Sequence, residues 1–177
     1  GNKDSTALVF AFDLTGILRW QKEYGMEWNN SFPGSRSTPT LKDSLLYVSS
    51  GKGSIACMKS REGEIIWSKD MISDFHGQAP YFGYAQSLLL NDSIVYAMPG
   101  GPDTNFVALN RFNGDIIWIS GGNGEKPAYN SPRIIHENGK QSLLTYSEKS
   151  FVGIDAKTGS LLWSESFKAQ YPNHANT

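Results

Sequence analysis

Apolar and polar positions along the chain follow one short frame that recurs four times. In each copy a polar turn with a glycine follows an apolar run, and a tryptophan stands four residues after that glycine. These tryptophans are Trp20, Trp67, Trp118 and Trp163, at intervals of 47, 51 and 45 residues. Recurrence at this period is typical of stacked supersecondary units, so the pattern predicts a repeat architecture.

The frame extends upstream of each turn. A small residue, followed by a bulky one, precedes every turn at Ala11, Cys57, Ala108 and Gly153. Before these columns a polar turn leads into an apolar, β-prone run at 43–48, 92–97 and 141–146, which predicts a strand in each copy. A hydroxyl column comes first, at Thr38, Ser87, Ser131 and Thr177. Each unit is therefore expected to hold four short strands, called here its first to fourth strands.

Helical periodicity is absent, so we predict an all-β fold. Four antiparallel strands repeated at this period indicate the blades of a β-propeller, and the tryptophans are expected to dock between blades. A stack of small β-sandwiches is the alternative, which the constant columns disfavour. The expected organisation of 1–177 is one propeller segment: a half blade at 1–36, blades at about 37–83, 84–127 and 128–170, and the start of a further blade at 171–177.

The repeated frame resembles the tryptophan-docking repeat of quinoprotein, or PQQ-like, β-propellers, A-x-D-x-x-T-G-x-x-x-W. Residues 153–163 match it apart from Gly for Ala, and residues 108–118 match with Asn in place of both Asp and Thr. Residues 57–67 keep only the apolar positions, the glycine and the tryptophan, and the first copy has a turn one residue shorter. The family includes quinoprotein alcohol dehydrogenases and a barrel-assembly lipoprotein of the bacterial outer membrane. The resemblance implies a periplasmic or envelope-associated protein.

Charge and composition narrow the choice of partners. The 16 basic and 17 acidic residues give a net charge of −1 without any block of like charge, which disfavours nucleic acid and anionic membranes. The sequence has no signal peptide and no apolar run of transmembrane length, and it starts at Gly1, so we expect a piece whose remaining blades lie elsewhere in a longer chain. The single cysteine, Cys57, is expected to be a packed thiol.

A propeller places the connections between blades, together with the loops between second and third strands, on one face around the central channel. The first two of these inter-blade connections are aromatic, at 24–36 and 75–84, so a ligand is expected on this face. The candidate ligand-binding residues here are Arg36, Tyr84, Gln86, Asn130, His174 and Asn176. Their amides and hydroxyls either bind a small polar ligand or only satisfy the backbone of the loops.

One loop between a second and a third strand departs from the others. Residues 99–105 insert extra positions, with Gly100 and Gly101 able to take positive φ, and with Asn105 as a further candidate for binding. A rigid tight turn fixed by the two prolines explains the loop equally well. Asp103 is the first candidate for a catalytic or metal-ligating carboxylate, and a solvated loop aspartate is the more ordinary explanation of it. No metal site is predicted from motifs, since His136 stands in a turn where a zinc-binding helix cannot form.

Two functions remain open at this point. The first is a binding module that presents the channel face to a protein, a carbohydrate or a small polar ligand. The alternative, implied by the resemblance, is part of a quinoprotein dehydrogenase in which PQQ held over calcium oxidises an alcohol or a sugar. The sequence has no adjacent cysteines and no acidic residue that matches the family's calcium or base positions, although a longer chain could supply PQQ and calcium sites. The binding module is the favoured interpretation.

Overall fold

The computed structural model describes residues 2–167, which form strands and loops. The strands are β1 (Asn2–Lys3), β2 (Thr6–Phe12), β3 (Leu18–Met26), β4 (Thr40–Lys42), β5 (Leu45–Ser49), β6 (Ser54–Lys59), β7 (Ile65–Asp70), β8 (Leu89–Asn91), β9 (Ile94–Ala97), β10 (Phe106–Asn110), β11 (Ile116–Ser120), β12 (Arg133–Glu137), β13 (Lys140–Tyr146), β14 (Ser150–Asp155) and β15 (Leu161–Ser166). Within this part of the chain there is no helix that could cross a membrane.

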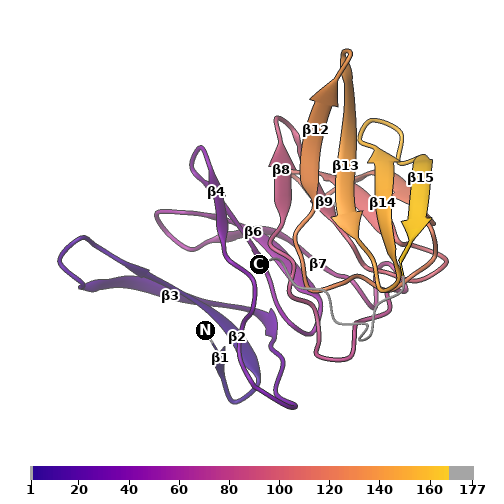
Figure 1. Cartoon of the computed structure of the whole chain (residues 1–177). Coiled ribbons are helices and arrows are strands. Elements are labelled where there is room, and N and C mark those ends of the chain that lie inside the picture. The colour runs from indigo at the N-terminus through magenta and orange to yellow at the C-terminus, as the bar shows by residue number, and fades with distance from the viewer. Residues whose placement is uncertain (1, 168–177) are drawn as a thin grey trace.

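The strands form four antiparallel sheets in chain order. Three sheets have four strands each, β4-β5-β6-β7, β8-β9-β10-β11 and β12-β13-β14-β15, and the N-terminal sheet is β1-β2-β3. Figure 1 shows the sheets fanned along an arc, with the N-terminal sheet at one end and β12–β15 at the other. The prediction of a β-propeller fragment with three complete blades and a half blade is confirmed.

The column of small residues is explained by the pairing of third and fourth strands. Each small residue lies directly opposite the tryptophan of its own sheet, in the pairs Ala11–Trp20, Cys57–Trp67, Ala108–Trp118 and Gly153–Trp163, and the register shifts immediately afterwards in every case. A Cβ on Gly153 would lie 2.5 Å from the Trp163 ring. A bulky side chain at this position would therefore collide with the indole.

Three tryptophans make the same contact with the following sheet. Each indole N–H donates to a backbone carbonyl at the turn between the next third and fourth strands: Trp20 to Ser60 at 3.2 Å, Trp67 to Arg111 at 2.8 Å and Trp118 to Ala156 at 3.2 Å. Each ring also covers the turn glycine of that sheet, where a Cβ would lie 2.7, 2.9 and 2.6 Å from the ring at Gly63, Gly114 and Gly159. These glycines also have φ between +69° and +76°, so the turn requires glycine for two reasons.

Hydroxyl groups connect the blades on the channel side. The backbone N–H of Thr38 donates to Ser87 Oγ, and that of Ser87 donates to Ser131 Oγ, both at 2.9 Å. The hydroxyl column therefore forms a chain of hydrogen bonds that runs from blade to blade just before the first strands. Its fourth member, Thr177, lies outside the described residues.

The sequence frame is wrong in one place, at 141–146. The backbone N–H groups of Ser60, Arg111 and Ala156 donate to the carbonyls of Ser44, Ser93 and Gln141, so Gln141 corresponds to Ser44 and not to Asp43. Gln141 and Ser142 lie within β13, and the turn falls at Asn138 and Gly139, where φ is +49° and +75°. A two-residue turn of this kind takes Asn-Gly readily and starts the hairpin earlier than the frame predicts.

The core lies between the sheets rather than within any one of them. One buried cluster joins the N-terminal sheet to β4–β7, a second joins β4–β7 to β8–β11, and a third joins β8–β11 to β12–β15. Cys57 belongs to the second cluster and is fully buried, and this burial raises the pKa of its thiol. The prediction that Cys57 is a packed thiol is therefore confirmed.

We expect the tryptophan contacts to stabilise the fold. Trp118→Ala should lower the free energy of unfolding by roughly 3–5 kcal/mol, because the ring is 9% exposed and covers the turn of the next sheet. Ile117→Ala, on the exposed side of the same strand, is the control and should cost under about 1 kcal/mol. Urea denaturation followed by far-UV circular dichroism would measure both. Equal losses would rule out a special role for the indole.

Candidate functional site

The inter-blade connections and the loops between second and third strands form one face. The N–H of Tyr84 donates to the Gly51 carbonyl, that of Gln78 to the Pro99 and Gly100 carbonyls, and that of Glu148 to the Lys126 carbonyl. Each connection is therefore hydrogen-bonded to a loop of a neighbouring blade. This face is where the sequence predicts a ligand.

Most of the aromatic residues predicted for this face are buried. Tyr24, Trp28, Phe75 and Tyr84 are 1–8% exposed and belong to the packing beneath the connections. The Tyr84 hydroxyl donates to the Pro99 carbonyl at 2.7 Å, and burial raises its pKa strongly. Tyr84 therefore anchors the loop at 99–105, and its ring is not presented to a ligand.

A smaller group of aromatic rings lies at the surface, called here the aromatic cluster: Phe32, Tyr81, Phe82 and Tyr129. The Phe82 ring lies 4.9 Å from Tyr81, 6.0 Å from Tyr129 and 6.3 Å from Phe32, measured between ring centroids. Phe32 and Tyr81 are 78% and 80% exposed. The backbone N–H of Phe82 also donates to the Tyr129 hydroxyl at 2.8 Å. Three inter-blade connections thus contribute to one surface.

Two hollows adjoin the aromatic cluster. One, of about 440 Å³, is lined by Phe32, Arg36, Phe82, Ala85 and Tyr129. The other, of about 360 Å³, shares Phe82 and Tyr129 with the first and is also lined by Pro80, Tyr81, Lys126, Pro127 and Glu148. The surface therefore combines protruding rings with recesses that have charged edges.

Arg36 shapes the first hollow. Its guanidinium donates to the Phe32 carbonyl at 2.6 Å and to the Ser31 carbonyl at 3.3 Å, and it lies 5.9 Å from the Trp28 ring. Phe32 has a φ of +54°, which a non-glycine residue rarely adopts, so the arginine closes a strained turn that projects the ring. Of the predicted binding residues that lie within 2–167, Arg36 is the one that lines a hollow beside the cluster.

The side-chain amides that were predicted to bind a ligand, those of Gln86 and Asn130, form hydrogen bonds with backbone groups instead. Gln86 is 1% exposed, and its side chain exchanges two hydrogen bonds of 3.0 Å with the N–H and carbonyl of Met98. Asn130, with its amide in the orientation that satisfies its neighbours, makes the equivalent pair with Tyr146 at 3.2 and 3.1 Å. Both side chains close the end of a second strand, which favours the structural alternative for them. His174 and Asn176 lie outside the described residues.

The irregular loop is clamped between two connections. A Cβ on Gly100 would lie 2.3 Å from Pro127 Cδ, and the N–H of Gly101 donates to the Glu125 carbonyl at 3.1 Å. Asn105 is fully buried and donates to the same carbonyl, which leaves its Oδ1 without a hydrogen-bond partner. Asp103 is exposed. The two glycines and Asn105 thus hold the loop, and Asp103 projects to solvent.

The described residues supply no cluster of acidic, histidine or cysteine side chains for calcium. Among residues 2–167, no three His, Cys, Asp or Glu side chains lie close enough together to hold a metal ion, and Asp103 belongs to no such group. The single cysteine of the sequence is the buried Cys57. No chemical step through these cofactors is therefore assigned to this chain.

Two carboxylates at this face were missed by the sequence analysis, the fully buried Glu27 and the half-buried Glu125. Glu27 Oε1 accepts from the N–H groups of Trp28 at 2.8 Å and Gly51 at 2.6 Å, while Oε2 lacks a partner. Glu125 accepts from the Ser147 and Ser150 hydroxyls and from the Lys149 N–H, at 2.7–2.9 Å. Each anchors a loop of the following blade. The sequence contains a signal that could have found them, which is their spacing. An acidic residue stands seven positions after each of the first three repeated tryptophans, at Glu27, Asp74 and Glu125.

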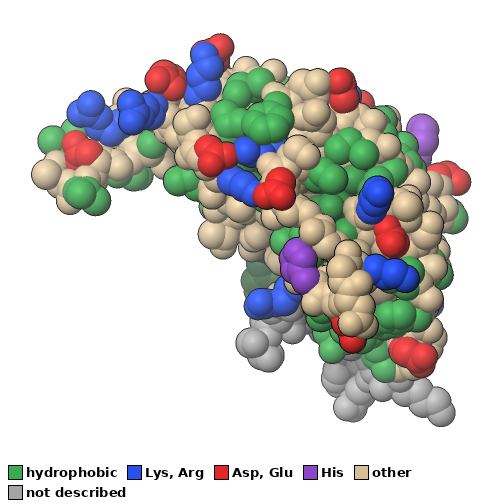
Figure 2. Space-filling model, turned by 90° about the horizontal axis from the view of Figure 1, so that it is seen from above, with side chains coloured by type: hydrophobic (Ala, Val, Ile, Leu, Met, Phe, Trp, Pro, Cys, Tyr) green, Lys and Arg blue, Asp and Glu red, His purple; other side chains and the backbone are tan. Residues whose placement is uncertain are grey.

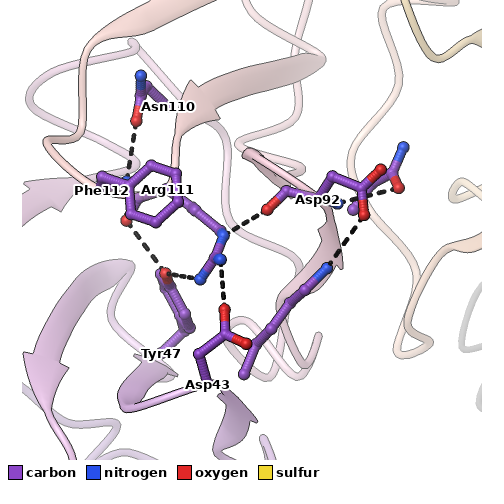
Figure 3. Close-up of polar contacts among 8 residues, drawn as sticks. Asp43, Tyr47, Asp92, Asn110, Arg111 and Phe112 are labelled. Atoms are coloured by element: carbon purple, nitrogen blue, oxygen red, sulfur yellow. Dashed lines mark hydrogen bonds and ion pairs between the residues drawn. The ribbon is translucent and has the colours of Figure 1, made fainter.

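Arg111 is a third residue that the sequence analysis missed. Its guanidinium, 6% exposed, donates to the Asp43 carboxylate at 2.5 Å, to the Tyr47 hydroxyl at 3.3 Å and to the Asp92 carbonyl (Figure 3). The Arg111 carbonyl accepts from both Trp67 and Tyr47. Arg111 therefore fastens β8–β11 to β4–β7 on the face opposite the aromatic cluster.

The sequence matches a known protein family over almost its whole length. The family model described as outer membrane protein assembly factor BamB matches residues 5–176. The chain belongs to this family of PQQ-like β-propeller proteins. BamB from Moraxella catarrhalis superposes with a TM-score of 0.64 at 16% identity, over 95% of this chain and 47% of that protein. No curated protein matches the sequence at a significant level.

A second solved structure has the same repeat. The quinohemoprotein alcohol dehydrogenase ADHIIG from Pseudomonas putida superposes with a TM-score of 0.56 at 22% identity, over 75% of this chain and 20% of that protein. This chain thus spans about half the length of the BamB structure and a fifth of the dehydrogenase. Identities at this level show a shared fold, and the predicted family resemblance is confirmed by the matching family model.

Gly100 allows a test of the clamped loop. Gly100→Ala should cost about 1–3 kcal/mol of stability more than Gly139→Ala, because both positions have positive φ but only the first would press a methyl group against Pro127. Around Gly139 no atom lies within 4 Å of the added Cβ, which makes it a matched control. Thermal and urea unfolding would measure the difference. Indistinguishable variants would show that the loop moves freely away from Pro127.

Proposed function

We propose that this chain is an extracytoplasmic binding module that recognises a protein partner through the aromatic cluster. The observation that carries the proposal is the exposure of Phe32 and Tyr81 in a connected group of rings, while the other aromatic residues of the same connections are buried. Exposed aromatic groups with an arginine nearby are typical of the energetic centres of protein interfaces.

The breadth of the surface favours a protein over a small polar ligand. The cluster draws on three connections, and the amides that would orient a small ligand are occupied by the backbone of Met98 and Tyr146. The clamped loop and the hydrogen bonds of Glu27 and Glu125 to the following blades fix the connections in place, so the surface is organised before a partner arrives. We assign to the tryptophans the role of docking each sheet onto the next one.

Family membership supports the location and the class of partner. The family carries the description of an outer membrane protein assembly factor, and BamB of Moraxella catarrhalis is among the similar structures. We infer from this a periplasmic or envelope-associated site of action and a protein as partner. The likeness to the quinohemoprotein alcohol dehydrogenase supports the fold, while the described residues supply no set of ligands for the cofactors.

The aromatic cluster can be tested by mutation and crosslinking. A photoreactive phenylalanine analogue at Tyr81 should crosslink a specific envelope protein in cells, and the Phe32→Ala/Tyr81→Ala double variant should bind that purified protein at least about tenfold more weakly, since interface aromatics contribute more than 1 kcal/mol each. Leu14→Ala is the control, because Leu14 is fully exposed on the turn between β2 and β3. Isothermal titration calorimetry would give the affinities.

The same protein allows the alternatives to be separated. Unchanged affinity of the double variant, with the fold intact by circular dichroism, would contradict the proposal. Binding of oligosaccharides in place of any protein would assign the rings to carbohydrate stacking instead. Dye reduction with alcohols or sugars in the presence of PQQ and calcium would favour the dehydrogenase.

A further inference from the structure

A cavity lies between β8–β11 and β12–β15, on the face opposite the aromatic cluster. It has a volume of about 350 Å³, and its lining comprises Asn91, Ile94, Tyr96, residues 139–141 and residues 155–157. This volume is within the range of small-molecule sites. Figure 2 views the molecule from above, toward the turns of the sheets, and shows acidic and basic side chains interspersed there.

The neighbouring interface shows what such a space can hold. The carbonyls of Arg111 and Ala156 each accept from a tryptophan and a tyrosine of the preceding sheet, Trp67 and Tyr47 in the first case and Trp118 and Tyr96 in the second. Arg111 and Ala156 therefore occupy equivalent positions in successive blades. The guanidinium that fills the first interface is replaced by a methyl group at the second, and the cavity adjoins it.

The acceptors that hold the Arg111 guanidinium have counterparts here. Tyr47 Oη corresponds to Tyr96 Oη, and the Asp92 carbonyl corresponds to that of Lys140. The counterpart of Asp43 is Asp92, whose side chain is 96% exposed and pairs with Lys42 at 3.6 Å outside the cavity. Tyr96 and Lys140 line the cavity. The Tyr96 hydroxyl donates its proton to the Ala156 carbonyl at 3.1 Å, so the lone pairs of Tyr96 Oη can accept a hydrogen bond from a ligand.

The lining of the cavity carries charges of both signs, from Lys140, Lys157 and Asp155. Asp155 accepts from the N–H and the hydroxyl of Thr158 and from the N–H of Lys157, and these hydrogen bonds, together with the nearby charge of Lys140, lower the pKa of its carboxyl and keep it anionic. Lys140 and Lys157 are both exposed, so their ammonium groups can extend into water. Gln141 supplies a further amide beside Asn91, at 2.7 Å.

We propose that this cavity is a binding site for a guanidinium group, supplied by a small cation or by an arginine side chain of a partner. The planar fork of donors would occupy the place that Arg111 fills one interface earlier, with Tyr96, the Lys140 carbonyl and the Asp155 carboxylate as acceptors. The site is independent of the aromatic cluster, so failure of either proposal leaves the other intact.

A titration followed by NMR would test the site. Methylguanidinium and the peptide acetyl-Gly-Arg-Gly-amide are the probes, with methylammonium and the corresponding lysine peptide as controls. Saturable shifts of the Gln141 and Ala156 amides with at least one guanidinium probe are expected, with at least tenfold weaker binding of the ammonium compounds. Binding by the small ion indicates a free cation as ligand, whereas binding by the peptide alone indicates a partner's arginine.

A variant pair completes the test. Ala156→Arg should abolish the shifts by filling the cavity, whereas Ile117→Arg, which adds the same side chain at an exposed position of β11, should leave them unchanged. If Ala156→Arg does not fold, Tyr96→Phe should weaken binding several-fold through the lost acceptor. Absence of saturable binding, equal binding of the ammonium compounds, or full binding by these folded cavity variants would overturn the proposal.

Discussion

The fold depends on the contact between the tryptophan of one sheet and the glycine turn of the next. The indole supplies a large apolar surface and one hydrogen bond, while the turn supplies a flat backbone surface and a carbonyl. Because both parts occur in every unit, the same contact can be repeated between successive sheets. The small residue opposite each ring and the bulge beside it follow from fitting the indole between two sheets.

The scaffold was predictable because its constraints are local and repeated. The turn glycine, the small column and the hydroxyl column each have one physical cause that acts at equivalent positions, so they leave a period in the sequence. Within residues 2–167 the frame was wrong at 141–146, where the hairpin turn at Asn138 and Gly139 changes the register of a single blade. A feature that occurs in one unit leaves no period to read.

The candidate binding site was less predictable from the sequence than the scaffold, because its residues do not recur from unit to unit. Gln86 and Asn130 are polar residues beside the channel, but whether an amide meets a ligand or a backbone group depends on the neighbouring strand. Exposure separates Tyr81 from the buried Tyr84 three residues later, and the sequence shows both as tyrosines of one connection. Arg111 was hidden because its partners, Asp43 and Tyr47, come from another blade.

The two parts of each contact between sheets are also synthesised in a fixed order, the tryptophan before the glycine turn. Trp20, Trp67 and Trp118 each precede the glycine that they cover by 43, 47 and 41 residues, so the ribosome delivers the ring well before its partner. Each new sheet then shields the aromatic edge left by its predecessor, and the nascent chain carries one uncovered indole forward as it grows. Until the covering turn is synthesised, the ring is apolar surface exposed on the growing chain, and exposed surface of this kind favours misassembly.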